Sequence, residues 1–274
     1  MDHVDIGIVD TRKLIRAIRD QYKYDYKNYA LTAFRQRVGR VLVNYHFKNV
    51  DDLIKKIVED ASFFEQFIKE ISVETTEMFR NPSIWRYMRD KFFPANVKGH
   101  KKYKIWLANI QTGEELYSMM ILLSEAGLLD QVECFASYDS DRNFEFIKDG
   151  IFKTKKTTVN EANYKRFNWF GELDKYFQVK DNMGYWDTSL IKNVVFSKQN
   201  ITFDNSPGKF HLVWYRNQMI YYNQILQDQI LKVIYDSLYP GGHLVIGEKE
   251  TLENSSQSKK FSLTHDSEHI YKKI

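Results

Sequence analysis

From residue 103 onward, strand-like and helix-like segments alternate, and this alternation limits the fold more than any other feature of the chain. The run YKIWLAN is typical of a buried strand, and GEELYSMMILLSEAG has the pattern of a helix ended by Gly127. A second strand, VECFAS, and a second helix, DRNFEFIKDG, come next. Because two strands joined by a helix run parallel, we expect a right-handed βαβ unit in a doubly wound α/β sheet.

Further strands are expected to complete this sheet. KFHLVWY and PGGHLVIGE have strand composition and flank the helical segment NQILQDQILKVIYDSLY. The stretches KKFSLTH and EHIYKKI predict a terminal hairpin, which adds antiparallel strands. Residues 152–191 are aromatic and polar, without helical periodicity over most of their length, and we interpret them as an inserted small β subdomain.

The first 72 or so residues show helical spacing instead, in LIRAIRDQY, YALTAFRQRVGRVLVNY, DDLIKKIVED and SFFEQFIKEI. Asp51 and Ser62 are predicted N-caps. In NPSIWRYMRDKFFP, we expect Asn81 to cap a helix, Pro82 to take its first position and Pro94 to end it. The predicted domains are a helical domain (1–75), a linker helix (76–102) and an α/β domain (103–274).

Charge and cysteine content exclude several classes of protein. The net charge is only +4, from 40 basic and 36 acidic residues, which is too weak for a committed nucleic-acid binder. The single Cys134 allows no intrachain disulfide and fits a reducing cytoplasm. No apolar run approaches the roughly 20 residues that cross a bilayer, so we expect a cytoplasmic protein without membrane insertion. The seven histidines are scattered, and no spacing predicts a metal site.

The segment ANIQTGEELYS, from Ala108 to Ser118, follows the first predicted strand and allows two interpretations. Ligands bind outside the carboxyl ends of strands in open α/β sheets, where Glu115 can accept hydrogen bonds from an ammonium or hydroxyl group. The alternative is a turn in which Thr112 caps the helix while Glu114 and Glu115 complement its dipole.

Five segments together resemble the CheR family of S-adenosylmethionine-dependent methyltransferases, which esterify glutamates of chemotaxis receptors. The resemblance covers most of the chain and implies a class I methyltransferase, Rossmann-like fold behind a small helical domain. Its motifs occur in the family's order as TEMFRNP (76–82), TGEELYSMMILL (112–123), NVVFSKQNI (193–201), YRNQMIYYN (215–223) and LYPGGHLVIGEKETL (238–252).

The resemblance implies that S-adenosylmethionine is the cofactor, with S-adenosylhomocysteine as product. It implies a protein substrate, a helical chemoreceptor-like protein with acidic methylation sites. Arg80 and Tyr221 match the family's candidate catalytic positions. The cofactor-binding positions that it implies are Glu74, Thr76, Arg80, Glu115, Tyr138, Asp139, Asn200, Ile201, Arg216 and Asn217.

The chain departs from the family pattern mainly around the cofactor. Asn109, Ile110 and Gln111 stand where small residues are usual, and Tyr138 takes the position of the ribose-binding aspartate, with Asp139 one residue later. Glu74 also replaces the usual asparagine. The leading hypothesis is a CheR-type methyltransferase acting on protein glutamates. The alternative is a catalytically weakened or inactive CheR-like regulatory or interaction protein, and a nucleic-acid methyltransferase is disfavoured.

Overall fold

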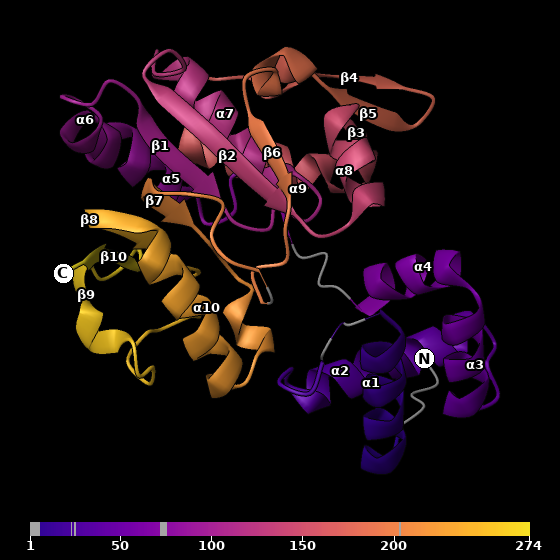
Figure 1. The fold of residues 1–274 in the computed structure, drawn as a ribbon. Coiled ribbons are helices and arrows are strands. Elements are labelled where there is room, and N and C mark those ends of the chain that lie inside the picture. Colours follow the sequence, from indigo (N-terminus) through magenta and orange to yellow (C-terminus); the bar gives the residue numbers. More distant parts are fainter. Residues whose placement is uncertain (1–5, 23, 25, 72–75, 203) are drawn as a thin grey trace. The chain divides into compact units, whose positions relative to one another are not determined.

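The computed structural model describes residues 6–22, 24, 26–71, 76–202 and 204–274 (Figure 1). The chain divides into two compact units. The first unit consists of residues 1–73 and 218–229, and the second of residues 74–217 and 230–274. A segment from late in the sequence therefore belongs to the N-terminal helical unit.

Four amphipathic helices form the first unit, as their apolar spacing predicts. They bury their apolar faces in one core, which includes Leu14, Phe34, Leu53 and Phe67. The ring of Tyr22 stacks on that of Phe64 with 3.6 Å between centroids. The helices are α1 (Ile8–Tyr22), α2 (Leu31–Asn44), α3 (Val50–Glu59) and α4 (Ala61–Ile71).

The two N-caps predicted in this unit are wrong by about two residues. The cap of α3 is Asn49, whose side chain accepts from the backbone N–H of Asp52 at 2.9 Å, and Asp51 lies in the first turn. Ahead of α4, the Asp60 carboxylate accepts from the backbone N–H groups of Ser62 and Phe63, both at 3.0 Å. In each case an earlier residue with an equally suitable side chain makes the cap, because only the backbone geometry decides between neighbours.

The segment 218–229 is held to the helical unit by backbone hydrogen bonds. The N–H of Ala30 donates to the carbonyl of Tyr221 at 2.8 Å, and the N–H of Asn223 donates to the carbonyl of Asn28 at 2.8 Å. The Arg37 guanidinium lies 4.5 Å from the centroid of the Tyr221 ring. Burial lowers the pKa of Arg37, which the nearby tyrosines partly offset.

A seven-stranded sheet forms the centre of the second unit and has the predicted mixed α/β architecture (Figure 1). Its strand order is β6-β2-β1-β7-β8-β10-β9. The first five strands are parallel, and β10 is antiparallel to both β8 and β9, as the predicted terminal hairpin requires. The strands are β1 (Tyr103–Leu107), β2 (Val132–Tyr138), β6 (Val195–Lys198), β7 (Phe210–Trp214), β8 (Leu238–Val245), β9 (Phe261–His265) and β10 (Ile270–Lys273).

Helices pack on this sheet through a continuous apolar core that includes Trp85, Ile105, Leu122 and Trp214. Gly127, with φ of +66°, follows the end of α7 as predicted. The helices with residues in this core are α5 (Pro82–Tyr87), α6 (Phe93–Asn96), α7 (Glu114–Glu125), α8 (Asp141–Lys148) and α9 (Thr157–Phe167), and α10 (Gln224–Ser237) runs from the first unit into the second.

Pro82 begins α5 as predicted, but Pro94 does not end the helix there. The chain passes from α5 into the π-helical turn η1 (Met88–Phe92) and then into α6, where Pro94 stands in the first turn. Proline has no backbone N–H, so Pro94 cannot donate to a carbonyl one turn earlier in this continuous helix. The wider π turn thus allows the helix to continue past the proline.

The segment 152–191 contains a second sheet of three antiparallel strands in the order β3-β5-β4. They are β3 (Ile151–Lys153), β4 (Phe177–Lys180) and β5 (Met183–Trp186). The segment also contains the helix α9, which the sequence analysis did not predict. Asn160 and Asn163 occupy its buried face and bond to Met78, so this face lacks the apolar period that marks an amphipathic helix.

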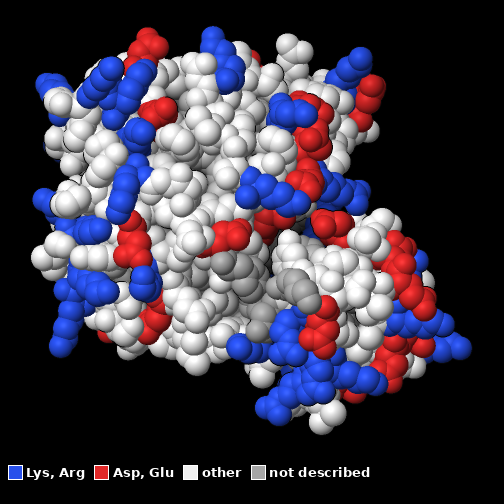
Figure 2. Space-filling model, viewed as in Figure 1, with Lys and Arg blue, Asp and Glu red and all other residues white. Residues whose placement is uncertain are grey.

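Basic and acidic side chains are interspersed over the face shown in Figure 2, in keeping with the small net charge. Among the described residues, no helix is long and apolar enough to cross a membrane. The same residues contain no group of three His, Cys, Asp or Glu side chains arranged to hold a metal ion.

Candidate functional site

The loop after β1 lies where the strand order of the large sheet reverses. β1 pairs with β2 on one side and with β7 on the other. The N–H of Ala108 donates to the carbonyl of Trp214 at 3.0 Å, and the N–H of Ile110 donates to the carbonyl of Ser137 at 2.8 Å. Such a switch point is the usual ligand site of an open α/β sheet, because the loops on its two sides diverge there.

Three residues of this loop have positive φ angles, which glycine adopts most easily, but only one of the three is a glycine. Asn109, Gln111 and Gly113 have φ angles of +59°, +46° and +94°. A Cβ atom on Gly113 would lie 3.0 Å from the side chain of Ile147, so the helix start also packs closely there. The loop keeps the left-handed turns that glycine favours, and the departure from the family pattern lies in the side chains.

Three hydroxyl and carboxylate groups meet at the start of α7. The hydroxyl oxygens of Thr76 and Thr112 lie 2.7 Å apart, and both hydroxyl groups donate to the Oε2 atom of Glu114. The prediction that Thr112 caps the helix is wrong: the N-cap residue is Gly113, and no side chain makes a cap hydrogen bond there. The cluster fixes the segment of Thr76 to the loop after β1.

A buried ion pair joins α7 to the end of β7. Nη1 of Arg216 donates to Oε1 of Glu115 at 2.9 Å, and the two side chains are 2% and 13% exposed. Nη2 of Arg216 donates to Oδ1 of Asn81 at 2.9 Å. Burial raises the pKa of Glu115, and the adjacent Arg216 opposes this shift by stabilising the carboxylate.

Arg80 lies beside the ion pair of Glu115 and Arg216. Its backbone carbonyl accepts from Nε1 of Trp85 at 2.9 Å, which fixes the chain just ahead of α5. Its half-buried side chain lies close enough to Glu115 to stabilise that carboxylate electrostatically. The structure thus brings together four of the predicted site residues, namely Thr76, Arg80, Glu115 and Arg216.

The ends of β2 and β6 carry four further predicted residues. The ring of Tyr138 stacks on Phe144 of α8, with 4.1 Å between centroids and 4° between planes. Asp139 follows in a bend outside the strand. Oδ1 of Asn200 accepts from the N–H and the hydroxyl of Thr202 at 3.0 and 2.6 Å, and Ile201 is buried.

Asn217, at the end of β7, has a φ angle of +60°, and its N–H donates to Oε2 of Glu250 at 2.8 Å. A Cβ atom on Gly247 would lie 2.5 Å from Oδ1 of Asn217, so only glycine fits there.

Tyr221 belongs to the first unit, and its role stays a prediction. Glu74 lies outside the described residues.

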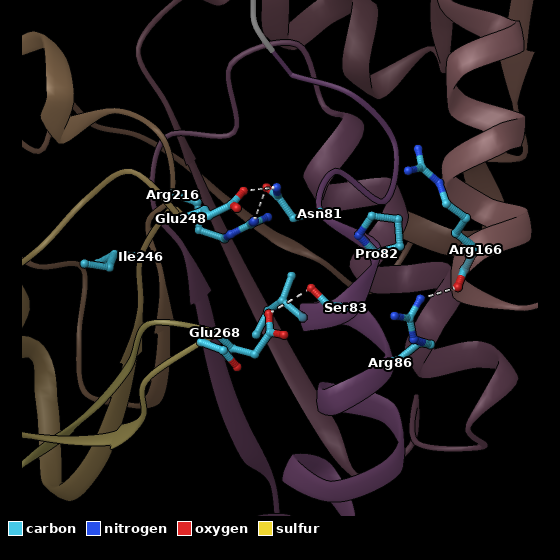
Figure 3. Close-up of a pocket in the computed structure, with 11 residues that line it drawn as sticks. Asn81, Pro82, Ser83, Arg86, Arg166, Arg216, Ile246, Glu248 and Glu268 are labelled. Carbon is cyan, nitrogen blue, oxygen red and sulfur yellow. Dashed lines mark hydrogen bonds between the residues drawn. The ribbon is translucent and has the colours of Figure 1, made fainter.

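A cavity of about 330 Å³ opens beside this cluster (Figure 3). Nδ2 of Asn81 donates to Oε2 of Glu248 at 2.6 Å, so Asn81 connects Arg216 to Glu248, and all three residues line the cavity. The cavity is lined by Asn81, Pro82, Ser83, Ile84, Arg86, Arg166, Arg216, Ile246, Glu248, Ser267 and Glu268.

Asn81 is the N-cap residue of α5, as predicted, but its side chain makes no cap bond. Glu248 and Glu250 were not predicted as site residues, because each bonds to residues far away along the chain. No local spacing signals such a contact.

The buried polar atoms in this region that have no hydrogen-bond partner among the described residues include Oε1 of Gln111 and Nε of Arg216. A buried acceptor and a buried donor are costly unless something satisfies them. Together with the half-buried acids and the buried Ile201, they offer the mixture of polar and apolar contacts that a nucleoside with a charged amino-acid tail requires. The residues present therefore fit a methyl donor of this kind.

Comparison with known proteins identifies the family of this chain. Residues 74–268 match the family described as CheR methyltransferase, SAM binding domain. Cher3 of Pseudomonas putida, named as a methyltransferase, is 30% identical over 265 residues, which cover 97% of each chain. Chemotaxis protein methyltransferase 1 of Vibrio cholerae is 26% identical and covers 80% of each chain. The chemotaxis protein methyltransferase of Borreliella burgdorferi is 22% identical and covers 92% of each. The chain belongs to the CheR family and is an S-adenosylmethionine-dependent methyltransferase.

Proposed function

We propose that this methyltransferase acts in the cytoplasm and esterifies glutamate side chains of a chemoreceptor-like protein. The observation that carries the proposal is the cluster of Thr76, Arg80, Glu115 and Arg216 at the switch point of the sheet. The relatives named as chemotaxis protein methyltransferases support a protein substrate of this class.

In this proposal, the cofactor-binding residues surround the loop after β1. Glu115 accepts from the ammonium group of the donor, Arg216 stabilises the ionised form of Glu115, and Asp139 accepts from the ribose hydroxyls. The remaining members of the proposed binding site are Glu74, Thr76, Tyr138, Asn200, Ile201 and Asn217.

The acceptor needs charge compensation more than proton transfer. A glutamate with an ordinary pKa of about 4.3 is already a carboxylate at neutral pH, so it attacks without a general base. The bound cofactor supplies a methyl group on a sulfonium sulfur. Arg80, the half-buried cation beside Glu115, compensates the acceptor carboxylate while it is aligned. For Tyr221, a catalytic role is proposed from its place in the motif YRNQMIYYN.

Transfer of labelled methyl groups tests the proposal. Purified protein is incubated with S-[methyl-³H]adenosylmethionine and a soluble chemoreceptor fragment, and the label is then treated with base. We expect the fragment to be labelled and to release methanol, because carboxyl methyl esters are base-labile. Loss of labelling in a fragment with Gln in place of the glutamates identifies the acceptor. Base-stable label would contradict glutamate esterification.

A further inference from the structure

The turn after α9 presents two adjacent aromatic side chains to solvent. Trp169 is 76% exposed and Phe170 is 93% exposed. The other four tryptophans, Trp85, Trp106, Trp186 and Trp214, are all buried. Exposed aromatic pairs are costly in water and mark interaction surfaces in soluble proteins.

This turn is rigidly held. The N–H of Gly171 donates to the carbonyl of Asn168 at 3.1 Å, and Nζ of Lys165 donates to the carbonyl of Gly171 at 2.8 Å. A Cβ atom on Gly171 would lie 2.5 Å from the hydroxyl of Tyr164, so the turn packs tightly on α9. Nδ2 of Asn168 donates to Glu125 on α7 at 3.1 Å. A turn fixed in this way loses little conformational entropy when a partner binds its aromatic side chains.

Two arginines next to the turn have no ion-pair partner among the described residues. Arg86 donates to the backbone carbonyl of Arg166, at the end of α9, and both arginines line the cavity beside the cluster of Arg216. In Figure 3 they lie on one side of the cavity, and the carboxylates of Glu248 and Glu268 lie on the other. The arginine side of the cavity is therefore cationic, and Arg166 precedes the exposed aromatic pair by three residues in the chain.

We propose that Arg86, Arg166, Trp169 and Phe170 form a docking surface for an acidic, amphipathic helix of the protein acceptor. On a helix, a carboxylate and an apolar side chain that are three or four residues apart lie on the same face. Such a face is complementary in charge to the two arginines and can pack its apolar side chains on the exposed aromatic pair. Two of its four residues, Arg86 and Arg166, line the cavity beside Arg216, and we expect the surface to select acceptors by the sequence next to the methylated glutamate. This inference rests on the proposed function.

Acrylamide quenching of tryptophan fluorescence tests the surface directly, since Trp169 is the exposed tryptophan. The probe is the soluble chemoreceptor fragment at several times its KM. We expect the fragment to remove most of the acrylamide-accessible fluorescence, and a Trp169→Phe variant to lack that accessible component without the fragment. Unchanged quenching at saturating fragment would overturn the proposal. Protection by phosphatidylglycerol vesicles without protection by the fragment would assign the surface to a membrane and would also overturn it.

Steady-state methyl transfer gives the second measurement. The double variant Trp169→Ala/Phe170→Ala should raise KM for the fragment about 10-fold, with the effect in KM rather than in kcat. Arg166→Glu should raise KM several-fold and reduce the salt dependence of KM. The matched controls are Ile274→Ala, at a side chain 72% exposed, and Lys101→Glu, an equal charge change at another exposed position.

Equal KM values in the surface variants and controls would refute the docking surface alone. Absence of base-labile transfer by the wild-type protein would refute the proposed function instead.

Discussion

Removal of Arg216 should destabilise the second unit strongly, because it deprives the buried Glu115 of its ion-pair partner and leaves only the nearby Arg80 to stabilise the carboxylate. The two side chains are only 2% and 13% exposed, and Arg216 also donates to Asn81 at 2.9 Å. Breaking one partner of a buried ion pair costs about 3–5 kcal/mol, and we expect Arg216→Met to cost about 4 kcal/mol. A second change, Glu115→Gln, removes the stranded charge and should restore about 2 kcal/mol.

Tryptophan fluorescence in urea measures this effect in the full chain. All five tryptophans belong to the second unit, so their emission reports its unfolding without contribution from the helical unit. A loss of 4 kcal/mol should lower the midpoint by about 1.5 M urea. The reasoning is refuted if Arg216→Met costs less than about 1 kcal/mol, or if the effects of the two substitutions simply add.

Three further predictions concern the rest of the second unit. Burial lowers the pKa of His211 to about 4, and its Nδ1 accepts from the N–H of Lys104 at 2.9 Å. The His211 imidazole is protonated below about pH 6.5 in the unfolded chain but only below about pH 4 in the folded chain. The contribution of His211 to the free energy of unfolding is therefore complete above pH 6.5 and is lost as the pH falls toward 4. The destabilisation of His211→Phe, about 1 kcal/mol at pH 7.5 in urea melts, should shrink at pH 4.5; an equal gap at both pH values would contradict this. Gln111→Gly should raise the free energy of unfolding by about 0.5–1 kcal/mol, because φ is +46° there, and a decrease would show that the side chain is needed for folding. Gly184→Ala should cost roughly 1–3 kcal/mol in the same melts, because the new Cβ would lie 2.1 Å from the ring of Phe152, and an unchanged midpoint would argue against this packing.

The order of the elements could be predicted from sequence because each strand and helix carries its own apolar period. The βαβ unit at β1, α7 and β2 is the clearest example. The helix α9 was missed because buried asparagines bonded to Met78 replace apolar residues on its inner face. This helix depends on a partner far away along the chain, and the local sequence pattern gives no sign of that contact.

The site was predictable only in part. The motifs placed Thr76, Arg80, Glu115 and Arg216 as separate candidates, whereas the bonds of Thr76 to Thr112 and of Arg216 to Glu115 follow from the fold. For Asn81, the position at the start of a helix was predictable, but the bonds of its side-chain amide to Arg216 and Glu248 were not. Gln111 and Asn109 show the reverse, because non-glycine residues keep a backbone that sequence alone assigns to glycine.

Calorimetric titration with S-adenosylhomocysteine tests the central claim, that the loop after β1 with Glu115 and Arg216 holds the cofactor. We predict one binding site per chain in the wild-type protein, with affinity reduced at least 10-fold in Glu115→Gln as a hydrogen bond to the ligand's ammonium group loses its charge. No heat of binding up to millimolar ligand, or equal affinity in the variant, would contradict the account.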